Sequence, residues 1–137
     1  MKVAPVIAQL KGVGYLTVGG ARDYRGLRSV PAKLPAAFVV PLSRQTETLG
    51  RTGIIHQNHT HNFAVVSLIT EARAGLAVDT DALGTLEDAL IERLTGWIYP
   101  AAASPVIATG GLDLADQLGC FAWATTFSFT STYRKAL

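Results

Sequence analysis

The stretch "IIHQNHTHNFAVVSLITE", Ile54 to Glu71, changes character half-way along and decides the fold. Its second half, "FAVVSLIT", is apolar on both faces of a strand, as expected of a central strand covered on both sides. Its first half, "HQNHTHN", is polar on both faces. A continuous strand of this length would run roughly 60 Å at ~3.3 Å per residue, whereas a domain of this size is roughly 37 Å across. The strand must therefore either break or project from the body as one arm of a β-hairpin with the residues before Gly53.

Shorter patterns predict the elements around this strand. Apolar residues at the spacing of one helical face predict a helix over Val3–Leu10 and an amphipathic helix that begins at the N-cap Asp79. The polar, glycine-containing residues 43–53 predict a loop or a hairpin tip. In chain order we expect a helix at 3–10, a strand at 15–20, a short helix at 21–27, a buried strand at 36–42, the long strand at 54–71, a helix at 79–97, a strand at 105–115 and a strand at 120–133.

The last predicted strand, "CFAWATTFSFTSTY", alternates large and small side chains and so has one bulky face. The helix before it carries an apolar stripe, and we expect stripe and bulky face to pack on one another. The stripe comprises Leu83, Leu86, Leu90, Leu94 and Trp97; the bulky face comprises Phe121, Trp123, Phe127, Phe129 and Tyr133. The predicted fold is a single α+β domain over residues 1–137. It has a mainly antiparallel β-sheet flanked by helices and a projecting β-hairpin arm.

Composition points to a protein that works in an assembly. Hydrophobic residues make up 49% of the chain and charged residues 16%. So few charges are unusual for a free monomer and suggest a surface covered by a partner or by further copies. The net charge is +2, without a basic run, which argues against sequence-specific nucleic-acid binding.

Targeting signals are not evident in the sequence. The N-terminus is too interrupted for a signal peptide, and Pro100 and Pro105 interrupt the uncharged stretch 94–112, so we expect no membrane association. The single Cys120 excludes an internal disulfide and fits a reducing compartment. We therefore expect a soluble, cytoplasmic protein.

The three histidines raise the possibility of a metal site. Gly53, five residues, then His59, Thr60 and His61 match the opening of the cupin metal motif. The glutamate that should follow is replaced by Val65 and Val66, and His56 would face away from the other two on a strand. Two imidazoles without a third protein ligand make a weak site. The alternative is a polar arm whose side chains hydrogen-bond to solvent or to a neighbouring subunit, and we expect no metal and no cofactor.

Signatures of catalysis are missing as well. The chain contains no phosphate-binding loop, nucleophile elbow or dinucleotide fingerprint. Cys120 lies on the small-residue face of an apolar strand, which favours a packed thiol over a nucleophile. We therefore predict that the protein is not an enzyme.

Several phrases in a fixed order resemble a known family. They are "PAAFVVPL", a polar loop, "QNHTHNFAVVSLIT", "LTGWIYP" and "FAWATTFSF". This order resembles the small phage tail terminator, or tail-completion, proteins of long-tailed phages and related prophages, over nearly the whole chain.

The resemblance implies an α+β subunit of a homo-oligomeric ring, a hexamer. Such a ring caps the tail tube, stops its polymerisation and offers a head–tail joining surface to the connector protein. It further implies a structural protein of the virion tail, assembled in the host cytoplasm, with DNA free to pass through the ring. The family supplies no catalytic residues.

Two rival functions remain, a cupin-like metal-dependent enzyme and a small monomeric binding module. The hairpin argument alone, and not the resemblance, provides the candidate interface residues. A ribbon that is polar on both faces gains little from burial and is suited to contacts between chains. We expect such contacts, between subunits or with the tube, from Arg44, Arg51, His56, His59 and His61.

Overall fold

The computed structural model describes residues 1–50, 52–70, 80–115 and 119–137. In chain order the elements are α1 (Ala4–Gln9), β1 (Thr17–Gly20), α2 (Ala21–Arg25), β2 (Ala36–Leu49), β3 (Ile54–Thr70), α3 (Thr80–Leu94), β4 (Ile107–Asp113) and β5 (Cys120–Ala136). This is the predicted order of helices and strands. The predicted N-cap Asp79 lies outside the described residues.

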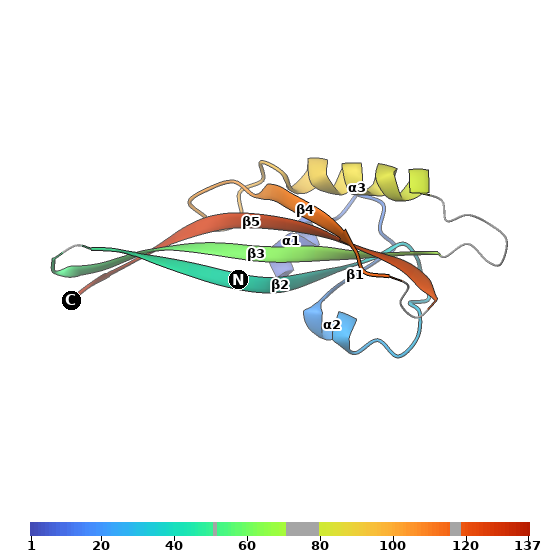
Figure 1. Ribbon diagram of the computed structural model, residues 1–137, viewed down its shortest axis with the longest axis horizontal. Coiled ribbons are helices and arrows are strands. Elements are labelled where there is room, and N and C mark those ends of the chain that lie inside the picture. The colour runs from blue at the N-terminus through green and yellow to red at the C-terminus, as the bar shows by residue number, and fades with distance from the viewer. Residues whose placement is uncertain (51, 71–79, 116–118) are drawn as a thin grey trace.

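The strands form one five-stranded sheet in the order β1-β2-β3-β5-β4. Only the β1–β2 pair is parallel, and the pairs β2–β3, β3–β5 and β4–β5 are antiparallel. Figure 1 shows an elongated molecule in which α3 and α2 lie on opposite sides of the sheet at one end. The predicted α+β fold with a mainly antiparallel sheet is confirmed.

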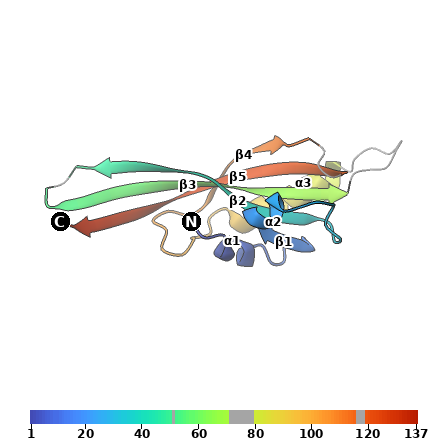
Figure 2. The same ribbon diagram turned by 90° about the horizontal axis from the view of Figure 1, so that it is seen from below.

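The long strand does not break. β3 pairs without a shift in register with the whole of β5, from Ile54 opposite Ala136 to Thr70 opposite Cys120. On its other side it pairs with β2, with a bulge between Pro41 and Ser43. Residues 43–49, for which the sequence allowed a loop, are therefore strand. Of the two predicted outcomes, projection is the one found (Figures 1 and 2).

The predicted hairpin arm is confirmed in β2 and β3, and β5 adds a third strand to it. The distal half of β5 runs beside β3 to the tip, where the amide of Leu137 donates to the carbonyl of Gly53 at 3.1 Å. Gly53 adopts a φ of 83°, in the left-handed region that favours glycine in tight turns. The sequence predicted β5 as a strand but gave no means of choosing its partner.

The principal core lies between the sheet and the helices α1 and α3. The rings of Phe63 and Phe127 stack at 5.5 Å between centroids, and Leu90 and Leu94 of α3 are fully buried in the same cluster. The predicted packing of the helical stripe on the bulky face of β5 is confirmed at these residues. Across the sheet, a second cluster places Phe38 and Leu68 against the small side chains of β5.

The predicted packing of the bulky face of β5 in the core does not extend fully to Trp123. Trp123 is only partly buried, at the side of the sheet where β5 meets β4. A Cβ at Gly111 would lie 2.9 Å from Cζ2 of Trp123, so the indole covers this glycine of the edge strand. The large residue at the centre of the core is Phe127 instead.

We expect Phe127→Ala to lower the free energy of unfolding by about 3–5 kcal/mol, the usual cost of truncating a fully buried aromatic side chain. Trp123→Ala is the matched comparison and should cost less, because its indole is partly exposed. Urea denaturation followed by circular dichroism measures both. A larger loss in Trp123→Ala than in Phe127→Ala would show that the core is centred elsewhere.

Candidate assembly surface

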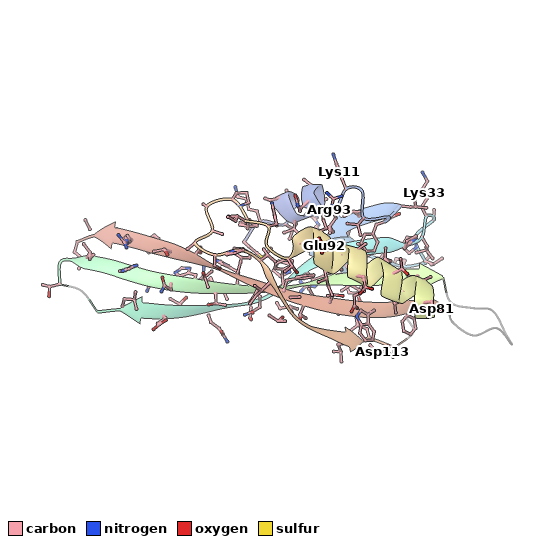
Figure 3. All side chains as sticks on the ribbon, turned by 90° about the horizontal axis from the view of Figure 1, so that it is seen from above. Lys11, Lys33, Asp81, Glu92, Arg93 and Asp113 are labelled. Carbon is pink, nitrogen blue, oxygen red and sulfur yellow. The ribbon has the colours of Figure 1, made fainter. Side chains whose placement is uncertain are left out.

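The arm, as defined here, consists of residues 43–49 of β2, 54–62 of β3 and 128–136 of β5. It extends beyond the helices, which all cover the other end of the sheet (Figure 2). The β2 side chains from Pro41 to Thr48 are all exposed. The charged residues labelled in Figure 3, Lys11, Lys33, Asp81, Glu92, Arg93 and Asp113, lie on the body.

One face of the arm carries a row of aromatic rings that starts in the body. Tyr99 stacks on Phe129 at 4.5 Å, and Phe129 stacks on His61 at 4.9 Å. His59 follows at 6.2 Å from His61, and Tyr133 at 6.2 Å from His59. We call these five residues the aromatic row. Strand alternation explains it, since neighbouring positions on β3 and β5 are filled by rings on the same face.

Hydrogen bonds hold three members of this row, His61, His59 and Tyr99. Nε2 of His61 lies 2.9 Å from Oγ of Ser131, across the β3–β5 ladder, and Nε2 of His59 lies 3.2 Å from Oε1 of Gln57. The hydroxyl of Tyr99 donates to the carbonyl of Lys2 at 2.8 Å and accepts from its amide at 2.9 Å. The row is therefore tied both to the arm and to the N-terminal segment.

A hollow of about 300 Å³ opens over this face, where the arm joins the body. It contains the whole aromatic row, so rings and hydroxyls, rather than acidic groups, meet a molecule that enters it. The lining residues are Met1, His59, His61, Tyr99, Pro100, Ala101, Phe129, Ser131, Thr132 and Tyr133.

The electrostatics of the hollow disfavour a charged His61. Desolvation lowers the pKa of His61 below its ordinary value of 6.5, and the positive charges of neighbouring groups, His59 and Arg44 among them, lower it further. Arg44 is the β2 residue opposite His61 in the ladder. His61 therefore favours the neutral form, which can both stack on Phe129 and accept or donate one hydrogen bond.

The structure brings together some of the predicted interface residues and separates others. Arg44, His59 and His61 share one face of the arm, since they occupy paired or alternate positions of β2 and β3. His56 is buried and lies on the opposite face, as strand alternation predicted. Arg51 lies outside the described residues. Sequence reasoning missed Tyr99, Phe129, Ser131 and Tyr133 as neighbours of the histidines.

The described residues offer few side chains that could support either rival function. No group of three or more His, Cys, Asp or Glu side chains gathers among the described residues. A second hollow of about 500 Å³ adjoins α3, and none of its described lining residues is titratable. Within the same ranges no helix is long and apolar enough to cross a membrane.

The family model for phage tail terminator proteins matches residues 1–136. The chain belongs to this family. The predicted resemblance is confirmed over essentially its whole length, and the protein is a structural component of a phage tail, associated with other virion proteins. Among curated proteins, none matches the chain significantly. The aromatic row and the arm are thus features of a tail terminator family member.

His61 should titrate below 6.5 in NMR spectra of its ring nitrogens, and Arg44→Gln should raise its pKa by removing a nearby positive charge. Between its folded pKa and 6.5 the unfolded chain binds the proton more readily, so this site destabilises the fold as the pH falls through that window. His61→Gln identifies the resonance by its loss. A His61 pKa at or above 6.5 would contradict the desolvated environment.

We expect no tightly bound transition metal, because His56 faces away from His59 and His61 and the two remaining imidazoles bind Ser131 and Gln57. The check is elemental analysis of dialysed protein purified without a histidine tag. One equivalent of zinc or iron, lost in His59→Ala and in His61→Ala, would contradict this and revive the enzyme hypothesis.

Proposed function

We propose that this tail terminator assembles into a ring, a hexamer, which caps the tail tube, ends its polymerisation and provides the surface that joins tail to head. The family match over residues 1–136 is the observation that carries the proposal. The ring's partners are then further copies of the chain, the tail tube protein and the connector protein. Assembly takes place in the host cytoplasm of a long-tailed phage, and DNA passes through the ring.

Within that ring we assign the arm to contacts between chains. In the arm the side chains of β2 from Ser43 to Thr48 and of β5 from Thr132 to Ala136 are exposed, and those of β3 are half-buried apart from the buried His56, so a lone subunit gains little stability from the arm. Arg44, His56, His59 and His61 lie in the arm, and we propose that these four residues and Arg51 make the contacts. Arg44 is an exposed cation and the half-buried His59 and His61 border the hollow, which suits recognition of another protein surface.

The change from apolar side chains in the body to polar side chains in the arm supports separate roles for the two parts. Phe63 and Phe127 close the body's core at the base of the arm, and distal to Phe63 the β3 side chains are polar as far as His56. Stability and assembly can therefore be altered separately. A monomeric binding module would have no evident use for such an arm.

Deleting Thr46 to Thr52 and closing the chain with a short turn should leave the body folded, because the described residues of this segment, 46–50 and 52, contribute nothing to either core cluster. The same deletion should abolish ring formation or tail completion. Circular dichroism with thermal melting monitors the fold, native mass spectrometry monitors the ring, and electron microscopy monitors tail length and joining to heads.

A matched control removes charge from the body instead of the arm. Arg22→Ala combined with Arg25→Ala changes two exposed residues of α2 and should leave tails normal. If the deletion unfolds the monomer, the segment belongs to the body. If the deletion variant still produces tails of normal length that join to heads, the arm is not needed for assembly.

A further inference from the structure

Both outer edges of the arm lack a neighbouring strand among the described residues. β1 covers β2 only from Ala36 to Val39, and β4 covers β5 only as far as Ser128. Beyond these points β2 continues to Leu49 and β5 to Ala136. Each free edge is at least as long as an ordinary strand, and unpaired edges of this kind are templates for pairing with another chain.

Two hydrogen bonds show which backbone groups of β5 face outward. The amide of Thr130 donates to Oγ of Ser104 at 2.9 Å, and its carbonyl accepts from the amide of Ala103 at 2.8 Å. Both groups of Thr130 therefore point away from β3. Because directions alternate along a strand and the β3–β5 register has no shift, the backbone groups of Thr132 and Arg134 also point outward.

The same reasoning applies to β2. The carbonyl of Pro35 accepts from Leu16 on the β1 side, so odd-numbered residues face outward as far as Pro41. Pro41, which lacks an amide hydrogen, is tolerated at such an outward position. The bulge between Pro41 and Ser43 then shifts the alternation by one residue. Beyond it the outward groups belong to Arg44, Thr46 and Thr48.

These two edges are complementary to one another. β2 and β5 are each antiparallel to β3, so they run in the same direction, toward the tip. A copy related by rotation about a ring axis would therefore place its β2 parallel to β5 of the first copy. In a parallel pair, Thr132 or Arg134 would lie opposite Glu47 and bond to the outward groups of Thr46 and Thr48.

Side-chain positions and charge agree with this arrangement. Glu47 is paired through Asn58 with Thr132, so Glu47, Thr132 and Arg134 all lie on the face opposite the aromatic row. On that face Glu47 is the only acidic residue of the arm ranges and Arg134 is the cation of β5, whereas Lys135 and the β2 cation Arg44 lie on the face of the aromatic row. Like charges oppose pairing of β5 with another β5 edge, and opposite charges favour pairing of β5 with β2.

We propose that the β5 edge of one arm pairs in parallel with the β2 edge of the next copy's arm, so that the arms form one continuous β-sheet around the ring. This inference rests on the proposed ring, whose interface it specifies. The contact is heterologous, the kind that closes into a ring when the rotation allows it. It also leaves the aromatic row of every copy on the same side of that sheet, open to the tube or the connector.

Cysteine cross-linking in assembled tails tests the pairing. Full-length Glu47→Cys/Thr132→Cys and Glu47→Cys/Arg134→Cys are each supplied to a phage that lacks the native gene, and the tails are purified and oxidised. Within one chain, positions 47 and 132 are two strands, about 9.6 Å, apart, too far for a disulfide. At least one double variant should yield a ladder of covalent oligomers on a non-reducing gel.

Two control variants carry either two introduced cysteines, as the test pairs do, or one. Thr46→Cys/Arg134→Cys places its thiols on opposite faces and should not cross-link. Glu47→Cys alone should stay monomeric on the gel, and a dimer from this single variant would indicate a symmetric contact and overturn the proposal. If both double variants enter tails but neither gives covalent oligomers, the edge pairing is wrong. The proposed ring is not contradicted by that result. Failure of the unmodified chain to enter tails would instead overturn the proposed function.

Exchange of charge provides a second, independent test. Glu47→Lys and Arg134→Glu should each reduce the yield of completed tails, and the double variant should recover it. Thermal melting of the free chains controls for folding. Two defective single variants whose combination stays defective, with all chains folded, would show that these side chains are not neighbours across the interface.

Discussion

Pairing of β3 with β5 along their full length is the constraint on which the rest of the structure depends. A polar strand cannot be held by burial, so its backbone groups must be bonded to neighbours or to water. β5 supplies these bonds from Cys120 to Ala136 without a shift in register, and β2 supplies them on the other side. The ladder therefore continues past the end of the hydrophobic core and carries the arm with it.

The same three strands serve two purposes because their side chains change along their length. In the body both faces are apolar, and the stack of Phe63 on Phe127 with Leu90 and Leu94 anchors the sheet to α3. In the arm the ladder is retained, while one face becomes polar and the other carries the rings of the aromatic row. The buried apolar clusters are thus concentrated at one end of the molecule.

The histidines illustrate how strand geometry limits function. Their spacing resembles the start of a metal motif, yet alternation puts His56 on one face and His59 and His61 on the other. The latter two are engaged by Gln57 and Ser131 and continue a row of aromatic rings from the body. The strand geometry therefore places the two histidines among rings and hydroxyls instead of among further metal ligands.

The sequence by itself determined the α+β class, the order of elements and the core face of α3, and it required the long strand either to break or to project, because periodicity and strand length depend on local pattern. It also separated His56 from His59 and His61. Only the tertiary structure decided that β3 stays continuous, that β5 is the third strand of the arm, and that Phe129, Tyr99 and Tyr133 join the histidines. Strand partners far apart in the chain are selected by the packing of the whole sheet, which no local pattern of residues encodes.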